Sequence, residues 1–413
     1  MGSGTKQPQI LPVKSPAVPT TMQPQAAVSK ETAWLRAQFA NFYRSSVPVP
    51  SDLQRREFGF GINKKIEFRH KGFRDQGELQ RYLVEEAPLF MSFSAARYRD
   101  PAGRPMERKG FLGSDLIFDL DKVYSGEPGH PAEEHHPVAC AYCLNRSKQD
   151  ALRLCDEFLF SDLGFSKNDA FLNFSGSKGF HVHIESDSVQ QLSQDARRQL
   201  ADFIGANELS SESFLSATFG EESIRKVGFH GPKKGEIGWK GRIHAFVRKR
   251  VAEISEGEVR APPFELRGKD VIELHERRAE LLDAVDRGLY AAFKSLEKIT
   301  PALITQALQH YRVELDKQVT LDTGRLIRLQ GSIHGDTGFL AKKLLWAQAA
   351  SFEPLRDALA FPKLTETVAI VPSVSGSIVL GGQVMEYNEG TRQDAPMALA
   401  VLLVAKKKAV LAL

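Results

Sequence analysis

The most constraining feature of this chain is a short apolar segment that ends in two carboxylates. Residues 114–123 have the sequence SDLIFDLDKV, whose apolar run predicts a buried β-strand. Because strand side chains alternate between faces, Asp119 and Asp121 point the same way. Like charges side by side at the edge of a core are unfavourable unless a positive group lies between them. Since Mg²⁺ and Mn²⁺ prefer carboxylate oxygens, the pair indicates half of a divalent-metal site.

A catalytic metal site of this kind usually takes a further acid from elsewhere in the chain. The candidate is Asp316 in VELDKQVT, which is expected just before another strand. Three acids on neighbouring strands can hold two metals for in-line phosphoryl transfer. Taken alone, the Asp-x-Asp pattern leaves other interpretations open: a surface edge, a Ca²⁺ site, or the nucleophile signature of haloacid-dehalogenase-type phosphatases, which DLDKV also fits.

A glycine-rich loop with donors suited to an anion lies in NFSGSKGFHVHI, residues 173–184. The loop joins two predicted strands, and its glycines let the backbone approach a ligand with free amide groups. Ser175, Lys178 and His181 add side-chain donors for phosphate. His181 and His183 alternate in register, so both face one side of the sheet. The alternative is an ordinary hairpin with a satisfied histidine.

A second anion-binding candidate is DTGRLIRLQGSIHGDTG, residues 322–338. A strand is predicted over 324–335, where Arg328 and His334 flank a Gly-Ser turn. Both side chains can reach the anion held by the Lys178 loop. The alternative is an ordinary strand and turn.

A histidine-rich loop precedes a Cys-x-x-Cys pair. His130, His135 and His136 come before Cys140 and Cys143, and a Cys-x-x-Cys with two nearby histidines is a tetrahedral Zn²⁺ donor set. The preferred ligands are His130, His136, Cys140 and Cys143, with His135 as the substitute. A free cysteine pair remains the alternative.

Charge and composition bound the class of protein. The formal net charge of +4 is too small to identify a partner, but residues 225–250 concentrate Lys and Arg, with Phe229, Trp239 and Phe246 interleaved. That stretch is either a phosphate-contacting surface or a solvated basic face. Three cysteines argue against a disulfide framework, and no signal peptide is recognised, so an intracellular location is expected.

The predicted elements alternate between strands and helices, which indicates a mixed α/β core. One helix is predicted over 148–165, stopped at Gly164, and one or two more over 269–299, ending before Pro301. The apolar run 397–405 is about half the length that spans a bilayer and is expected to be a core helix or strand.

The order of these signals is more specific than any one of them. FDLD, the Cys/His cluster, SGSKGFH and RLIRLQGSIHGDTG follow one another as in the small catalytic subunit of the archaeal and eukaryotic DNA primase, which the chain resembles from about Arg56 to about Leu340. The resemblance implies a mixed α/β (α+β) primase core with a zinc knuckle and an inserted helical subdomain. It also implies metal-binding acids at Asp119, Asp121 and Asp316. The nucleotide-binding residues that it implies are Ser175, Lys178, His181, Arg328, His334, Glu57 and Arg69.

The expected organisation has five parts. They are a disordered leader (1–32), a first part of the catalytic core (33–190) with the zinc knuckle (128–145), a helix-rich insertion (191–310) with the basic stretch 225–250, a second part of the core (311–360), and a C-terminal segment packing on the core (361–413).

The activity implied is template-directed synthesis of short primers on single-stranded DNA from nucleoside triphosphates, that is, nucleotidyl transfer by a DNA-directed RNA polymerase of primase type. Mg²⁺ or Mn²⁺ is the implied catalytic cofactor and Zn²⁺ the structural one. The implied partner is a large subunit carrying an iron–sulfur cluster, which must lie on another chain because such clusters usually need four cysteines. The implied location is cytoplasmic, nucleoid-associated if the source is archaeal, with no membrane contact. A primase-like repair polymerase and a catalytically inactive, zinc-stapled nucleic-acid-binding subunit remain alternatives.

Two residues depart from the family pattern. Lys178 stands where Arg is usual, and Asp336 stands where relatives have Lys in a His-x-Lys-Thr-Gly run. A carboxylate beside a triphosphate is unexpected, so Lys342 or Lys343 is expected to reach back and supply the missing charge.

Overall fold

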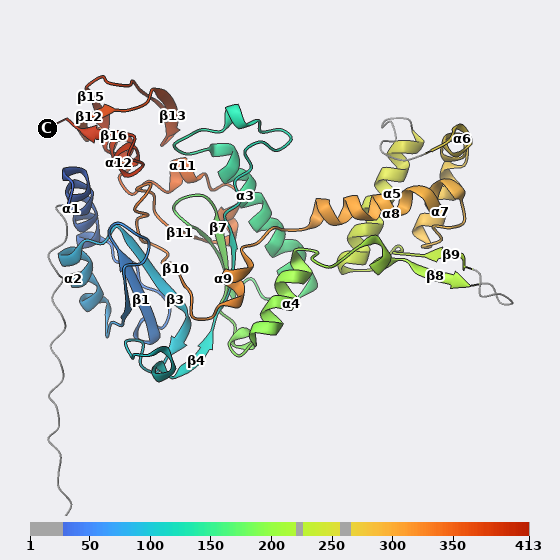
Figure 1. Cartoon of the computed structure of the whole chain (residues 1–413), viewed down its shortest axis with the longest axis horizontal. Helices are drawn as coiled ribbons and strands as arrows, with labels where there is room; N and C mark the ends of the chain where they lie inside the picture. The colour runs from blue at the N-terminus through green and yellow to red at the C-terminus, as the bar shows by residue number, and fades with distance from the viewer. Residues whose placement is uncertain (1–27, 220–225, 257–265, 413) are drawn as a thin grey trace, which may run out of the picture.

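Two antiparallel sheets form the core of the chain. The computed structural model describes residues 28–219, 226–256 and 266–412, so nearly all of the leader expected over 1–32 lies outside the described residues. The first sheet has the order β10–β3–β1–β2, with β4 also paired to β3, and the second has the order β11–β6–β7–β5 (Figure 1). The strands of the first sheet are β1 (Arg56–Gly61), β2 (Phe68–Lys71), β3 (Phe90–Tyr98), β4 (Phe111–Ser114) and β10 (Leu326–Arg328). Those of the second are β5 (Leu116–Leu120), β6 (Ala170–Phe174), β7 (Phe180–Ile184) and β11 (Lys342–Leu344).

The register of the second sheet separates a polar row from an apolar one. Asp119 pairs with His181, His181 with Asn173, and Asn173 with Lys343, so these four side chains share one face. The neighbouring row across β5, β7 and β6 consists of Phe118, Val182 and Leu172, all fully buried. Alternation along β5 therefore anchors the strand on one face and presents a carboxylate on the other.

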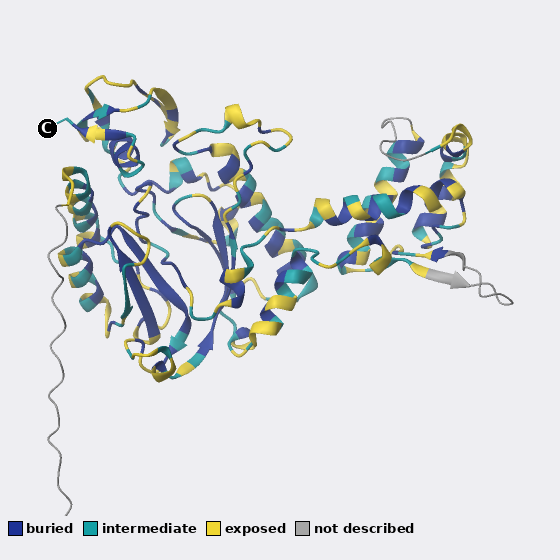
Figure 2. Cartoon of the chain, viewed as in Figure 1, coloured by how far each residue is buried: buried dark blue, intermediate teal, exposed yellow. Residues whose placement is uncertain are grey.

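Helices cover both sheets. Helices α1 (Lys30–Ser45) and α2 (Gln76–Glu86) pack together against the first sheet, and α3 (Ala141–Arg153) packs on β5 and β7 (Figure 1). The strands are buried throughout most of their length, whereas the outer helix faces are exposed (Figure 2). The other helical elements around the core are the π-helical η4 (Leu154–Asp162), α4 (Gln194–Ile204), α9 (Lys317–Leu321) and the short turns η1 (Leu53–Arg55), η2 (Met106–Lys109), η3 (Ala132–Glu134), η5 (Asp187–Val189) and η6 (Ser211–Phe214).

A helical arm projects from this core between α4 and α9 (Figure 1). It consists of α5 (Gly238–Ser255), α6 (Gly268–Glu276), α7 (Arg278–Asp286), α8 (Lys294–Tyr311) and the hairpin β8 (Ser216–Phe219) with β9 (Lys226–His230). The link from α8 back to the core is held at three points. Val313 N donates to Ile204 O (3.3 Å), Glu314 pairs with Lys122 (2.9 Å), and Lys317 pairs with Asp202 (2.6 Å).

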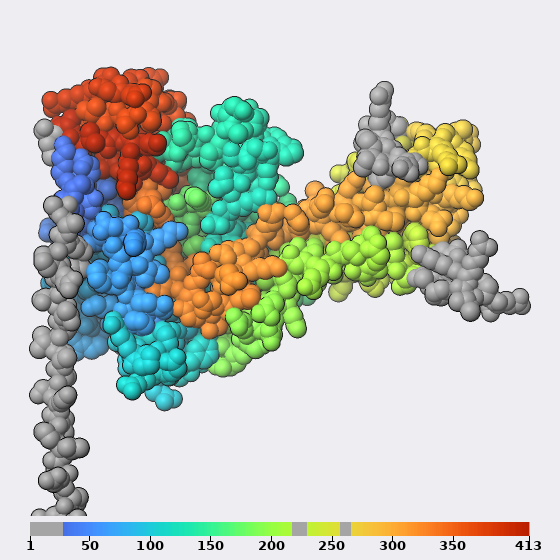
Figure 3. Space-filling model, viewed as in Figure 1, coloured from blue at the N-terminus to red at the C-terminus, as the bar shows by residue number. Residues whose placement is uncertain are grey.

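The C-terminal segment returns to the N-terminal helix, as Figure 3 shows from the red segment lying against the blue one. Its helix α12 (Met397–Ala405) is almost wholly buried and contacts α1, which confirms the expectation of a core helix or strand over 397–405. The remaining elements are α10 (Trp346–Ala349), α11 (Pro354–Asp357), the sheet β15 (Gln393–Pro396)–β12 (Thr367–Pro372)–β16 (Ala409–Leu411), and the hairpin β13 (Gly376–Leu380)–β14 (Gln383–Tyr387). Within the described residues, no helix combines the length and apolar character needed to cross a bilayer.

Three element boundaries differ from the prediction. The helix expected over 148–165 begins at Ala141 and becomes π-helical before it stops ahead of Gly164, whose φ of +70° favours glycine. Helix α8 continues through Pro301 instead of ending before it, since tertiary packing of its buried face outweighs one missing N–H donor. The strand expected over 324–335 is only three residues long, because the chain turns after Arg328.

A buried ion-pair cluster fixes the start of β5. The Asp115 carboxylate is fully buried and accepts from Arg56 Nη2 (2.6 Å), Arg97 Nη1 (2.5 Å) and Gln190 Nε2 (3.0 Å). Arg56 is itself fully buried, so its charge depends on this carboxylate.

We expect Asp115→Asn to lower the free energy of unfolding by about 3 kcal/mol or more, because it leaves a buried guanidinium without its counter-charge. The matched control is Asp52→Asn, which removes the half-exposed second partner of Arg97 and should cost under about 1 kcal/mol. Urea denaturation of both variants measures the difference, and equal losses would contradict the structural role given to Asp115.

Candidate active site and metal centres

Three acids meet at the end of β5. Asp119 lies in β5 and Asp121 just after it, and both line a cavity of about 400 Å³. Asp316 caps the N-terminus of α9, where its Oδ1 accepts from Gln318 N at 3.0 Å. The backbone N–H of Asp316 donates to Asp119 O at 3.0 Å, which holds the third acid beside the pair. The prediction of a strand after Asp316 was wrong, because helix α9 (Lys317–Leu321) follows it. The structure nevertheless brings the three acids together.

Within the described residues, no lysine or arginine pairs directly with Asp119, the most buried member of the acid cluster, although the charges of Arg325 and Lys65 act on it from further away. Burial, followed by the charges of Asp121 and Asp316, raises the pKa of Asp119 to about 7. Asp119 Oδ1 has no hydrogen-bond partner within the described part of the chain, and His181 Nε2 lies 3.5 Å away. A buried, orphaned carboxylate oxygen with two acids beside it is the arrangement that a hard divalent cation satisfies. The donor set therefore fits Mg²⁺ or Mn²⁺.

Two glycines allow the 175–179 loop to lie against this cluster. A Cβ on Gly179 would lie 1.8 Å from Leu120 O, so the loop backbone touches the end of β5 directly. Gly176 has φ +80°, and a Cβ there would lie 3.0 Å from His334 Cβ. Any larger residue at either position would separate the loop from the carboxylates or from His334.

The same cavity is also lined by positively charged side chains. Arg328 is 7% exposed, donates from Nη1 to Met91 O (3.1 Å) and lies over the Phe90 ring. Burial lowers the pKa of Arg328 to about 10, so it stays charged near neutral pH. It forms no ion pair within the described ranges. Lys178 also lines this cavity, and an unpaired buried guanidinium that shares a cavity with a lysine is suited to an anionic ligand.

Both histidines in the cavity are neutral donors. His334 Nδ1 accepts from Asp336 N at 3.1 Å, which places the ring proton on Nε2. Burial and the nearby Arg328 hold the pKa of His334 well below its ordinary value. The same causes lower the pKa of His181 to about 3. Each ring can therefore offer a hydrogen bond without adding a charge.

The structure thus brings most of the predicted site residues into one cavity. Those lining it are Asp119, Asp121, Ser175, Lys178, His181, Arg328 and His334, with Asp316 adjacent. Glu57 and Arg69 do not line it. Arg69 Nε and Nη2 bind the two oxygens of buried Glu57 (2.8 and 3.3 Å), and Nη2 also donates to Gly324 O (3.1 Å). This pair supports the segment that leads into β10.

Basic cavity residues were missed from the sequence, among them Arg325, whose Nη2 pairs with Asp316 Oδ2 at 3.3 Å, and one expectation about charge was wrong. Lys65, in the turn after β1, lines the cavity, and its positive charge partly opposes the rise in the pKa of Asp119. Neither Lys342 nor Lys343 lines the cavity. Lys342 Nζ donates to Asp357 O (2.7 Å), and Lys343 Nζ lies 3.8 Å from the centre of the Phe171 ring, so neither reaches back to Asp336. Ordinary sequence patterns carry no signal for Lys65, since its position depends on a tertiary turn.

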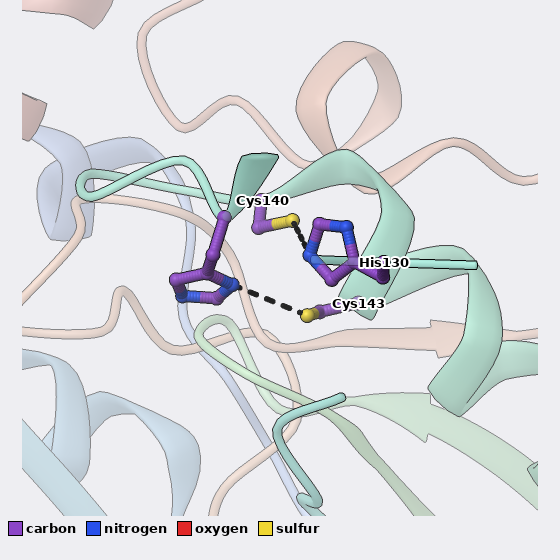
Figure 4. A group of neighbouring side chains, drawn as sticks. His130, Cys140 and Cys143 are labelled. Atoms are coloured by element: carbon purple, nitrogen blue, oxygen red, sulfur yellow. Dashed lines mark hydrogen bonds between the residues drawn. The ribbon is translucent and has the colours of Figure 1, made fainter. Parts of the chain in front are cut away.

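The knuckle between β5 and α3 gathers four metal-ligating side chains. The ligand atoms of His130, His135, Cys140 and Cys143 all lie within 4.8 Å of one another. Cys140 Sγ is 3.3 Å from His130 Nε2 (Figure 4), and Cys143 Sγ is 3.5 Å from His135 Nδ1. Tetrahedral Zn²⁺ with ordinary Zn–S and Zn–N bonds places such atoms about 3.5 Å apart. The two histidines and two cysteines therefore fit Zn²⁺.

The preferred assignment of His136 as a ligand is corrected by this geometry. His136 Nε2 lies 2.9 Å from Ser377 O, and its Nδ1 accepts from the N–H groups of Val138 and Ala139. Both ring nitrogens are occupied, so His135 takes the fourth position.

The basic stretch 225–250 is largely neutralised by acids. The ion pairs in its described part include Arg242–Asp162, Arg242–Glu157, Arg248–Asp286, Arg250–Glu253, Lys240–Glu236 and Lys249–Glu253. Trp239 is buried, and Arg225 lies outside the described residues. This pairing favours the solvated face over a dedicated phosphate-contacting surface.

Comparisons with known proteins agree with the order of these features. The model of the family described as "DNA primase small subunit" matches residues 118–346. A protein named DNA primase small subunit PriS from Methanocella arvoryzae is 32% identical over 400 residues, covering 91% of this chain and 98% of the relative. Relatives of the same name from Halorubrum lacusprofundi (31% identical; 91% and 97% covered) and Methanosarcina acetivorans (30%; 91% and 96%) are similar over as much of the chain.

The chain belongs to the DNA primase small subunit family. This membership confirms the expected fold class and the expected DNA primase catalytic subunit. The matched region begins at residue 118 and so includes both Asp119 and Asp121, which assigns that motif to the primase family rather than to the phosphatases. The similarity also covers more of the chain than the stretch from Arg56 to Leu340.

The stability of the metal-free primase subunit should depend on pH through Asp119. Its pKa is raised in the folded state, so stability falls as pH rises from about 4, the ordinary value, to about 7. We expect Asp119→Asn to melt at a higher temperature than the parent near pH 8, with the difference shrinking towards pH 4. Thermal melts in chelator across this range measure it, and a difference that does not vary with pH would contradict the shift.

The knuckle assignment predicts different outcomes for two adjacent histidines. His135→Ala should reduce bound zinc from about one ion per chain to well below one and lower the melting temperature, because a ligand is lost. His136→Ala, the matched control, should retain the metal. Elemental analysis of protein purified without chelator decides between them, and loss of zinc only in the His136 variant would reverse the assignment.

Proposed function

We propose that this protein synthesises primers on single-stranded DNA by two-metal nucleotidyl transfer. The observation that carries the proposal is one cavity that combines clustered carboxylates with cationic and neutral donor side chains. Asp119 and Asp121 line it with Asp316 adjacent, and Arg328, Lys178 and His334 line it as well. A nucleoside triphosphate with its metal ions has the complementary charge distribution.

In this mechanism Asp119, Asp121 and Asp316 would hold two divalent ions, and the cationic and donor side chains of the same cavity would bind the phosphate tail. When bound, the metal pair lowers the pKa of the attacking 3′-hydroxyl and neutralises charge on the leaving pyrophosphate. Arg328 contributes a fixed charge, and His334 contributes its Nε2–H as a neutral donor. Ser175 Oγ already accepts from the N–H groups of Ser177 and Gly179 (both 3.3 Å), which leaves its hydroxyl proton available to a phosphate oxygen. The hydroxyl attacks the α-phosphorus, and the bond to pyrophosphate breaks.

The assembly proposed is a heterodimer with a large subunit that carries an iron–sulfur cluster. The relatives are named as small subunits, which supports a larger partner. With two of three cysteines in the knuckle, this chain has too few for such a cluster. We place the complex in the cytoplasm, and on the nucleoid if the source is archaeal. Zn²⁺ in the knuckle and Mg²⁺ or Mn²⁺ at the acids are the proposed cofactors, and nucleoside triphosphates and single-stranded DNA the proposed substrates.

Primer synthesis tests the proposal directly. We expect Asp119→Asn, Asp121→Asn and Asp316→Asn each to reduce synthesis by about 100-fold or more, since several kcal/mol of metal-dependent stabilisation is lost. Glu314→Gln is the matched control, because this acid pairs with Lys122 outside the cavity. Incubation with single-stranded template, Mg²⁺ or Mn²⁺ and either ribo- or deoxynucleotides, with and without a preformed primer, measures the rates.

The same assay separates the proposal from its alternatives. Synthesis only from a preformed primer would favour a repair polymerase of the same chemistry. Template binding without any metal-dependent synthesis would favour an inactive nucleic-acid-binding subunit. Parent-like synthesis by any of the three aspartate variants would remove that residue from the metal site.

A further inference from the structure

The turn between the antiparallel strands β1 and β2, residues 62–67, forms part of the wall of the active-site cavity. Gly59 lets this β1–β2 turn lie close to the sheet, since a Cβ there would lie 3.4 Å from Ile66 Cγ2 and 2.5 Å from Leu326 Cδ1. Ile66 and Leu326 both line the cavity. A turn that follows directly from β1 is therefore placed beside the acids and the buried arginine.

One carboxylate holds the shape of the β1–β2 turn. Glu67 Oε2 accepts from Ile62 N (2.6 Å) and Asn63 N (3.3 Å), and Glu67 Oε1 accepts from Asn63 Nδ2 (3.4 Å). The chain doubles back tightly inside this bracket, since a Cβ on Gly61 would lie 1.8 Å from Lys64 O. The turn is therefore fixed by its own residues, which gives the side chains that it carries a defined position.

Lys65 is the cation that the β1–β2 turn brings to the cavity. Lys65 lines the cavity, whereas its neighbour Lys64 does not. Lys65 is exposed, and within the described ranges no carboxylate lies within 4.0 Å of its ammonium. Its charge acts on the cavity: burial and Arg328 lower the pKa of His181 and of His334 most, and Lys65 lowers both further. The ammonium is thus available to a ligand in this cavity.

The charges of the cavity indicate which ligand this ammonium fits. Three carboxylates and a triphosphate together carry more negative charge than two divalent ions neutralise. Asp336 lines the same cavity and adds a further carboxylate. The remaining negative charge needs cations that are not committed elsewhere, and among the described residues Arg328, Lys178 and Lys65 line the cavity without an ion pair.

We propose that Lys65 contacts a phosphate oxygen of the bound nucleoside triphosphate, and that Glu67 is the positioning residue that holds its turn in place. The inference rests on the proposed function of the cavity. It assigns to the β1–β2 turn a part in substrate binding, and it provides the cation that Lys342 and Lys343 do not.

Equilibrium binding tests the Lys65 contact without requiring catalysis. A nucleoside triphosphate, inorganic tripolyphosphate and a single-stranded oligodeoxynucleotide are each titrated into the full chain at a fixed Mn²⁺ concentration. We expect Lys65→Ala to weaken binding of both triphosphates about tenfold, and Lys65→Arg to restore most of it, because one charge-assisted contact is lost and then replaced. Lys64→Ala, the matched control from the same turn, should change either affinity less than about twofold, since an exposed charge outside the cavity is screened by salt.

A double-mutant cycle tests the role of Glu67. Glu67→Ala should weaken triphosphate binding, although removal of a negative charge alone would strengthen it, and should cause little further loss in the Lys65→Ala background. Glu67→Gln should restore most of the affinity, because its amide oxygen can still accept from Ile62 N. In primer synthesis, Lys65→Ala and Glu67→Ala should both raise the KM for nucleotide more than they lower kcat.

The outcomes separate this inference from its alternatives. Parent-like affinity of Lys65→Ala for both triphosphates, or an equal loss in Lys64→Ala, would overturn the contact. A loss confined to the oligodeoxynucleotide would overturn it in favour of a template contact, and full additivity of Glu67→Ala with Lys65→Ala would overturn the positioning role. A parent protein that binds triphosphate and makes primers while Lys65→Ala is unaffected refutes this inference alone. A parent that binds no triphosphate refutes the proposed function as well.

Discussion

The repulsion among three carboxylates at the end of β5 is the constraint on which the rest of the site depends. The fold holds Asp119, Asp121 and Asp316 together at a cost that appears as the raised pKa of Asp119. Rigid neighbours make this possible. The buried row of Phe118, Val182 and Leu172 anchors β5, and the backbone bond from Asp316 N to Asp119 O fixes the approach of α9. A side-chain contact could yield to the repulsion, whereas a backbone hydrogen bond inside a packed core yields far less.

The cationic and donor groups of the same cavity are arranged differently. Arg328 is buried without an ion pair among the described residues, and the neutral histidines add donors without adding charge. Neither the acids nor the buried cation is therefore electrostatically complete by itself. In the function proposed above, one ligand that carries both metal ions and phosphates would complete both groups together, which would link substrate recognition to the placement of the metal.

The sequence predicted features that depend on neighbouring residues along the chain, and few that depend on tertiary contacts. The period-two alternation of β5 was enough to place Asp119 and Asp121 on one face, and the Gly-rich loop was located from its glycines. The choice between His135 and His136 could not be made, because adjacent residues in a loop have no periodic rule to separate them. Lys65 reaches the cavity only because of the tertiary position of the turn that carries it. Pro301 favours a helix end locally, yet the apolar face of α8 extends past it.

The link between the helical arm and α9 has a mechanical consequence. Helix α8 is 18 residues long, about 27 Å, and a rod of that length would act as a lever on whatever follows it. The clamps at Val313, Glu314 and Lys317 lie on either side of Asp316 and tie the chain to α4 and to the end of β5. Force on the arm is therefore borne by these anchors before it can reach the carboxylate. The arm is also tied to the core through Arg242, which pairs with Glu157 and Asp162, and through Trp239 Nε1, which donates to Phe203 O, so contacts well away from Asp316 share this load.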